Sequence, residues 1–253
     1  MKRSRYDPGR NTERICCKML DAILFDLDGT LLSMDNDHFV EVYFGYLAKK
    51  AALWGYTDSA LLFKTIWEGV AAMVKNDGSR TNGEAFWECF CRTFGQEAWQ
   101  DIERFNSFYE NEFNQAKTVA DLTKDAKKAV RLARQKAKYV ILATNPIFPR
   151  CADVTRLAWL GLTLEDFDLV TDYENCGTSK PNPAYYTGIL TQFSLDPSKC
   201  LMIGNDVEED VIAANKAGIS TWLMNEHVIN RKNRTVECPQ GSYEEMIKFL
   251  ESL

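Results

Sequence analysis

The sequence is poor in the residues that build zinc and thiol sites. Its 253 residues include only two histidines, His38 and His227, and none of the eight cysteines forms a C-x-x-C pair. Structural zinc needs closely spaced cysteine and histidine ligands, so we expect no such site. Cys89 and Cys91, the two cysteines closest to that spacing, have no neighbouring histidine. We therefore expect reduced thiols without a catalytic role.

Other missing features disfavour three further classes of protein. No uninterrupted apolar stretch approaches the ~18 residues of a membrane span, and no signal-peptide pattern follows the basic N-terminus. The net charge of −6 provides no positive footprint for nucleic acid. No G-x-G-x-x-G follows the first apolar run, which leaves a dinucleotide-binding fold without support. We expect a cytoplasmic monomer or homodimer that binds neither membranes nor nucleic acids.

The residues that are present divide the chain into three parts. Residues 1–18 are polar and include Pro8 and Gly9, which predicts a disordered leader. Residues 35–117 hold four of the six tryptophans, with aromatic residues at helical spacing, and we predict a separate helical domain there. Residues 19–34 and 118–253 alternate short apolar runs with helical patterns, which is typical of a parallel sheet covered on both faces.

Five apolar runs are the predicted strands of this sheet. They cover residues 22–27, 139–143, 168–171, 200–203 and 220–223. Helical patterns are found around residues 150–160, 183–193, 207–217 and 242–252. The predicted fold class is therefore α/β, with a doubly wound parallel sheet and an inserted α-helical domain.

Polar side chains follow the first four predicted strands. Ligands of open α/β sheets bind outside the carboxyl ends of the strands, so we expect these side chains to meet at one edge of the sheet. Strand by strand, they are Asp26 and Asp28; Thr144 and Asn145; Lys180; and Asn205, Asp206, Glu208, Glu209 and Asp210.

These side chains point to phosphate chemistry assisted by a hard cation. Clustered carboxylates without a usable histidine favour Mg²⁺, which would neutralise them and let a phosphate approach. Asp26 and Asp28, at i and i+2 of an extended strand, are expected to face one substrate as nucleophile and proton donor. Thr144 offers a hydroxyl to phosphoryl oxygens, and Lys180 offers a positive charge at the transferring group. Each residue alone is also common in turns and helix caps; their joint occurrence after successive strands favours a site.

Four segments resemble the motifs of the haloacid dehalogenase-like (HAD) hydrolase superfamily. They read F-D-L-D-G-T, A-T-N-P, S-K-P-N-P and I-G-N-D-V-E-E-D, and they extend from Phe25 to Asp210. The resemblance implies a Mg²⁺-dependent phosphatase that hydrolyses a small phosphorylated metabolite through an aspartyl-phosphate. It also implies an α/β core with a helical cap inserted between the first and second motifs, where residues 35–117 lie.

The resemblance further implies a role for each motif residue. Asp26 would attack phosphorus and bind Mg²⁺ through its other oxygen. Asp28 would protonate the leaving group and then activate water, while its backbone carbonyl binds the metal. Thr144, Asn145 and Lys180 would bind the phosphoryl group, and acidic residues of the fourth motif would complete the metal site.

The fourth motif departs from the commonest family pattern, which begins with Gly-Asp. Here Asn205 follows Gly204, and Asp206 comes one place later. Either Asn205 binds Mg²⁺ through its amide oxygen or Asp206 takes that position. We favour Asp206 on charge grounds, with Asp210 as a further ligand or as a residue behind the ligands.

The helical insert is where we expect substrate specificity to be set. Caps of this family close over the active site, exclude water and contact the leaving group. Most aromatic side chains of the insert are predicted to form its own core. The loop from Asn76 to Gly83 is the predicted specificity element, with Arg80 as a contact for a substrate anion.

Several alternative functions stay open at this point. A phosphomutase, which returns the phosphate to its substrate, would use the same residues, and a non-catalytic phosphate-binding protein could keep the same fold. A dehalogenase is disfavoured because carbon–halogen displacement needs no acid at Asp28. A signalling receiver domain also places Asp, Thr and Lys at strand ends, but such a domain is about half this length.

Overall fold

A parallel sheet forms the centre of the computed structural model, which describes residues 19–253; the predicted leader, residues 1–18, lies outside the described residues. Its strand order is β3-β2-β1-β4-β5-β6, and every neighbouring pair is parallel. The strands are β1 (Leu20–Phe25), β2 (Ala137–Leu142), β3 (Leu169–Val170), β4 (Cys200–Gly204), β5 (Ser220–Met224) and β6 (Gln240–Gly241). The predicted α/β sheet is confirmed, and the short β6 is the strand that the apolar pattern missed.

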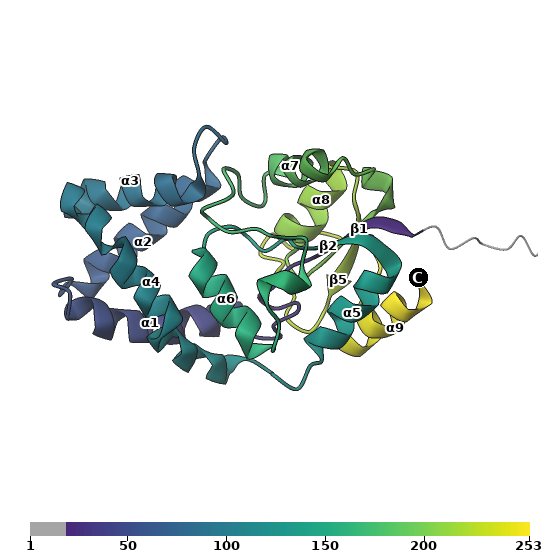
Figure 1. Cartoon of the computed structure of the whole chain (residues 1–253), viewed down its shortest axis with the longest axis horizontal. Helices are drawn as coiled ribbons and strands as arrows, with labels where there is room; N and C mark the ends of the chain where they lie inside the picture. The colour runs from purple at the N-terminus through teal and green to yellow at the C-terminus, as the bar shows by residue number, and fades with distance from the viewer. Residues whose placement is uncertain (1–18) are drawn as a thin grey trace, which may run out of the picture.

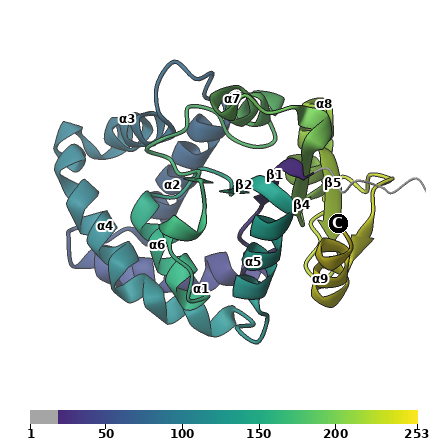
Figure 2. The ribbon, with the colours of Figure 1, turned by 45° about the vertical axis from the view of Figure 1, so that its right-hand side comes forward.

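Helices cover both faces of this sheet. They are α5 (Ala126–Lys136), α6 (Arg150–Trp159), α7 (Pro183–Phe193), α8 (Ala213–Lys216) and α9 (Tyr243–Ser252). Figures 1 and 2 show α7 and α8 on one side of the strands and α5 and α9 on the other. The side chains of β1 alternate accordingly: Ala22 and Leu24 pack with α7 and α8, whereas Ile23 and Phe25 pack with α5 and α9. This two-sided burial is the doubly wound arrangement predicted from the sequence.

The segment between β1 and α5 is helical, as predicted. It contains α1 (Asn36–Ala52), α2 (Ser59–Val74), α3 (Asn82–Phe94) and α4 (Ile102–Glu110), with 3₁₀ segments at Gln96–Asp101 and Glu112–Val119. These helices gather to one side of the sheet (Figure 1). One hydrophobic cluster runs from them into the core without a break, so their division from the core at residues 35–117 stays a prediction. No helix within residues 19–253 has the length and apolar character needed to span a membrane.

Capping residues set where the helices of the insert begin. Asp35 precedes α1, and its side chain accepts the backbone N–H of His38. Thr81 and Glu84 form a capping box at the start of α3. The loop before α3 therefore ends at Thr81, and Gly83, which was predicted to lie in that loop, is in the first turn of the helix.

Candidate active site

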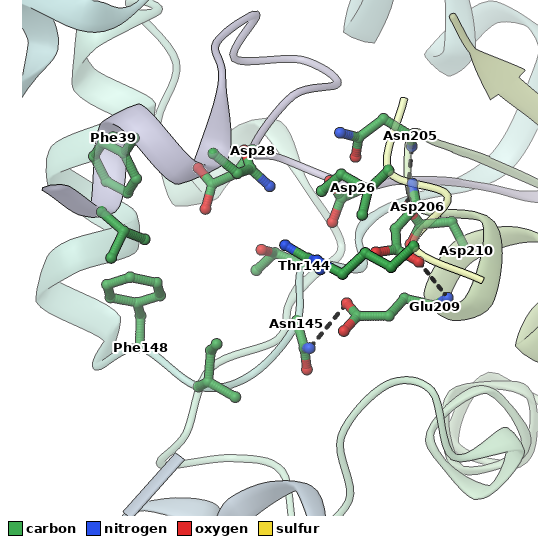
Figure 3. A pocket seen from close by; sticks show the side chains of 15 residues that line it. Asp26, Asp28, Phe39, Thr144, Asn145, Phe148, Asn205, Asp206, Glu209 and Asp210 are labelled. Atoms are coloured by element: carbon green, nitrogen blue, oxygen red, sulfur yellow. Dashed lines mark hydrogen bonds between the residues drawn. The ribbon is translucent and has the colours of Figure 1, made fainter. Parts of the chain in front are cut away.

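The carboxyl ends of β1, β2 and β4 open into one pocket of about 160 Å³ (Figure 3). Polar residues predicted from three separate strands therefore meet, although up to 184 positions separate them along the chain. Lys180 is buried directly behind this pocket and contacts Asp26. The lining residues are Asp26, Asp28, Asn36, Phe39, Val40, Thr144, Asn145, Ile147, Phe148, Asn205, Asp206, Glu209, Asp210, Ile229 and Arg231.

A tight turn, rather than the strand itself, brings Asp26 and Asp28 together. β1 ends at Phe25, not at residue 27 as predicted. The backbone N–H of Asp26 still donates to the carbonyl of Ile203 on β4, at 2.9 Å. The chain then turns around Leu27, whose carbonyl accepts the N–H groups of residues 30 and 32. The two carboxylates thus face one pocket because of the turn, and the expected strand alternation is not the reason.

Gly29 makes that turn possible. Its φ is +82°, a left-handed conformation that glycine adopts without steric cost. A Cβ at this position would lie 2.1 Å from the side-chain nitrogen of Asn205. Gly29 therefore permits both the backbone conformation and the close approach of the loop after β4.

Lys180 links the nucleophile predicted from the sequence to the fourth motif. Its ammonium nitrogen lies 2.9 Å from Oδ1 of Asp26 and 2.6 Å from Oδ1 of Asp210, and the lysine is fully buried. Oδ2 of Asp210 accepts the backbone N–H groups of Asn205 and Asp206, each at 3.0 Å. Both oxygens of Asp210 are thus engaged by the protein. Asp210 was predicted to be either a Mg²⁺ ligand or a residue behind the ligands. The geometry favours the second role.

Arg156, a residue that the sequence analysis did not identify, holds Asp28. It is a fully buried side chain of α6, and its guanidinium pairs with Oδ2 of Asp28 and with Asp153. The same guanidinium carbon lies 4.2 Å from the centre of the Phe148 ring. Oδ1 of Asp28 is buried and has no hydrogen-bond partner among the described residues. The i, i+3 spacing of Asp153 and Arg156 is that of an ordinary surface ion pair, so nothing in the sequence signals their burial.

The two candidate metal ligands of the fourth motif have different surroundings. The amide nitrogen of Asn205 donates to the carbonyl of His227, at 2.7 Å, and its amide oxygen accepts the hydroxyl of Thr30, at 3.4 Å, so both polar atoms of this side chain have protein partners. Oδ1 of Asp206 accepts the N–H groups of residues 208 and 209 at the start of a π-helical turn, Val207–Ile212. Its Oδ2 makes no hydrogen bond to any described residue. The geometry therefore favours Asp206 over Asn205 as a ligand.

The carboxylates carry more negative charge than their buried cations neutralise. Burial raises the pKa of Asp26, Lys180 opposes the rise, and the nearby charges of Asp210 and Asp28 add to it. Burial and the charge of Asp206 raise the pKa of Glu209 to about 8. Glu209, which was noted in the acidic loop but not predicted as a site residue, accepts a hydrogen bond from Asn145 at 2.9 Å. A bound cation would relieve this repulsion.

The donor atoms present fit a hard cation that keeps part of its own hydration shell. Within residues 19–253, no group of three or more His, Cys, Asp or Glu side chains forms a complete metal cage. Mg²⁺ does not need one, because it is usually held by one or two carboxylates together with water and phosphate oxygens. Asp26 and Asp206 would supply the carboxylates, with Oδ2 of Asp206 as the donor that no described residue engages.

Thr144 and Asn145 occupy the end of β2, where the sequence placed a phosphate contact. Thr144 is buried beside the two carboxylates of the first motif. Its carbonyl accepts the hydroxyls of Thr171, at 2.7 Å, and Tyr185, at 3.0 Å. These two bonds hold the loop in place and leave the Thr144 side chain on the pocket wall.

Arg80 is not brought to the pocket. Its guanidinium pairs with Glu88 on the neighbouring helix α3, and Arg80 is not among the lining residues. The expected contact with a substrate anion is therefore not supported, because this arginine has a closer carboxylate. The cationic side chain on the pocket wall is instead Arg231, which also pairs with the exposed Asp37 at 3.3 Å.

Comparison with known proteins gives one consistent result. A family model described as haloacid dehalogenase-like hydrolase matches residues 20–218. The chain is 25% identical, over 81% of its length and 84% of the relative, to ribulose-1,5-bisphosphate 5-phosphatase of Halopiger xanaduensis. It is 27% identical, over 87% of its length and 92% of the relative, to glyceraldehyde 3-phosphate phosphatase of Methanothermobacter thermautotrophicus. The fold resembles the HAD-hydrolase YfnB of Bacillus subtilis, solved bound to magnesium, with a TM-score of 0.58, 17% identity, and coverage of 92% of this chain and 100% of that one.

Proposed function

Because the chain belongs to the haloacid dehalogenase-like hydrolases, we propose that it is a Mg²⁺-dependent phosphatase of a small phosphorylated metabolite. One observation carries this proposal: each of the two carboxylates after β1 has one oxygen held by a buried cation. Lys180 holds Asp26, and Arg156 holds Asp28. The names of the two curated relatives, both phosphatases of small phosphorylated compounds, support the substrate class. The magnesium in the solved relative supports the choice of cation.

In the proposed mechanism, Asp26 is the nucleophile. It attacks phosphorus with the oxygen that Lys180 leaves free, and the alcohol departs as an aspartyl-phosphate forms. Lys180 offsets part of the charge that carboxylate and phosphate bring together. Thr144 and Asn145 orient the phosphoryl oxygens. Mg²⁺, when bound, would neutralise the remaining charge, and Asp26, the carbonyl of Asp28 and Asp206 would hold it.

Asp28 transfers the proton in both halves of the reaction. Its Oδ1 donates a proton to the leaving-group oxygen as the bond to phosphorus breaks. The same oxygen then takes a proton from the water that hydrolyses the aspartyl-phosphate. Arg156 keeps Oδ2 of this carboxylate engaged, so Oδ1 is the atom that exchanges the proton.

Release of inorganic phosphate from p-nitrophenyl phosphate and from a panel of phosphorylated metabolites, with and without Mg²⁺, tests the proposal. We expect turnover that requires Mg²⁺ and is lost in the Asp26→Asn variant. The Glu244→Gln variant, which changes an exposed carboxylate in the first turn of α9, should keep full activity. Transfer of phosphate to a second hydroxyl of the substrate would identify a phosphomutase. Absence of turnover of every phosphoester in the presence of Mg²⁺ would favour a phosphate-binding protein without activity.

Location and assembly rest on the sequence alone. A cytoplasmic location and a monomeric or homodimeric state stay predictions from the sequence. Sedimentation of the purified protein would distinguish the two assembly states.

A further inference from the structure

The pocket has a charged end and an apolar end (Figure 3). The carboxylates after β4 lie at one end, and Phe39 and Phe148 lie at the other, with Asp28 between Asp26 and Phe39. In phosphoryl transfer the attacking and leaving oxygens lie roughly in line on opposite sides of phosphorus. If Asp26 attacks and Asp28 protonates the leaving oxygen, the leaving group must extend past Asp28 toward the two phenylalanines.

A second cavity lies against this apolar end. Val40, Ile147 and Phe148 line both cavities, so the two share a wall made of these side chains. The second cavity measures about 80 Å³ and extends among the helices α1, α2, α3 and α4. Nine of its fifteen lining residues are aromatic, the other six are aliphatic or proline, and no charged side chain is among them.

This lining offers little to a hydroxylated leaving group. The polar atoms of its side chains are three tyrosine hydroxyls and two indole N–H groups, and the indole of Trp87 already donates to the hydroxyl of Tyr173. A sugar that entered here would lose hydrogen bonds to water without gaining equivalent ones, which is unfavourable. An apolar group would gain from leaving water.

The cavity also differs from an ordinary packing defect in a protein core. Protein interiors contain few voids larger than a water molecule, whereas this one lies directly against the candidate active site. Trp67 forms part of its wall while 51% of that residue is exposed to solvent. The indole of Trp67 packs on Phe44, with ring centroids 5.7 Å apart, and its exposed half leaves room in solvent for the ring to turn.

We propose that this cavity binds the leaving group of the substrate, and that the substrate is a phosphate monoester of an apolar alcohol. This inference rests on the proposed phosphatase function. The cavity is about half the size of the ~150 Å³ apolar cavity that takes up benzene. A short branched alkyl group matches this volume, and a larger ring requires Trp67 to turn outward.

A matched series of substrates tests the inference. Propyl phosphate and glycerol 1-phosphate have the same charge and carbon chain and differ by two hydroxyls. We expect a higher kcat/KM for propyl phosphate, and a further rise of roughly fourfold per added methylene through butyl to 3-methylbutyl phosphate. Equal or lower kcat/KM for the alkyl esters would overturn this inference and leave the phosphatase function intact. Absence of turnover of every ester would overturn both.

Two valines of α2 provide a variant and its control. Val70 lines the cavity, whereas Val74, one turn later, does not. Val70→Phe should fill the cavity and flatten the rise of kcat/KM along the alkyl series, while Val74→Phe should leave that rise unchanged. A rise that survives in a folded Val70→Phe variant, as judged by circular dichroism, would contradict the assignment.

Inhibition of the unaltered enzyme by product alcohols provides a test that needs no variant. We expect 3-methyl-1-butanol to compete with the substrate at concentrations at least tenfold lower than glycerol does. Equal inhibition by both alcohols would contradict an apolar leaving-group site.

Discussion

One carboxylate oxygen of Asp28 is held by the guanidinium of Arg156, a fully buried side chain that comes from α6. The arrangement parallels the bond between Lys180 and Asp26. In each pair a buried cation fixes one oxygen, and the other oxygen has no ion-pair partner among the described residues. In the proposed mechanism, two cations from distant parts of the chain prepare these two acidic residues of one turn for different roles.

Replacing Arg156 should impair proton transfer more than phosphate binding. In Arg156→Met we expect kcat for an alkyl phosphate to fall by about 10²–10⁴-fold, the range that general acid catalysis contributes. The fall should be much smaller for p-nitrophenyl phosphate, whose leaving group needs no proton. Arg156→Lys keeps the charge and should restore part of the loss. Steady-state kinetics with both substrates measures the difference.

The control for this experiment is a second arginine paired with a carboxylate. Arg134 pairs with Asp168 at the partly exposed end of α5, and Arg134→Met should leave both activities unchanged. Urea unfolding of each variant reports stability, because breaking a buried ion pair costs about 3–5 kcal/mol. An equal loss with both substrates would show that Arg156 acts through the fold rather than through Asp28.

Magnesium dependence should separate Asp206 from Asn205. Asp206→Ala removes the carboxylate whose Oδ2 is unengaged, and we expect the Mg²⁺ concentration for half-maximal activity to rise by about 10–100-fold. Asn205→Ala removes a bond to His227 and a contact with Gly29, so its main effect should be on stability. Activity titrated with Mg²⁺ decides between them. If only the Asn205 variant needed more Mg²⁺, Asn205 would be the ligand.

Stability without divalent cations should decrease as the pH rises. The pKa of Glu209 is raised from its ordinary value of 4.5 to about 8 in the folded protein. Between these values the folded state binds the proton more tightly than the unfolded state, so stability present below pH 4.5 is lost as the pH rises through 8. Because part of this side chain reaches solvent, we expect a loss of about 1–2 kcal/mol.

Thermal unfolding in EDTA from pH 5 to pH 9 measures this loss. Glu209→Gln should flatten the profile, and added Mg²⁺ should raise the melting temperature most at the alkaline end. A profile that is unchanged in Glu209→Gln would rule out this residue as the source.

Substitution by alanine should change the free energy of unfolding in opposite directions at two glycines. Gly29→Ala places a side chain at φ +82° and against the amide of Asn205, and we expect a loss of about 1–3 kcal/mol in the free energy of unfolding. Gly188 lies within α7 with open space around its Cα, so Gly188→Ala should be neutral or stabilise by up to about 1 kcal/mol. Urea denaturation of both variants makes the comparison.

The local pattern of the sequence was sufficient for the sheet and for the motif residues. The five predicted strands lie within two residues of those observed, because a strand buried on both faces requires a continuous apolar run. Asp26, Thr144 and Asp206 were identifiable because parallel strands bring their carboxyl ends to a common edge.

Only the tertiary structure decided which groups surround these residues. Arg156 and Asp28 are separated by 128 positions, and no local pattern encodes that contact. Arg80 was expected at the pocket, but it pairs with a carboxylate on α3 instead. Arg231, which follows β5 in the chain, lines the pocket wall. The apolar cavity likewise needs four helices to enclose it. Periodicity reports which face of an element is buried, whereas the partners on that face depend on how distant elements pack.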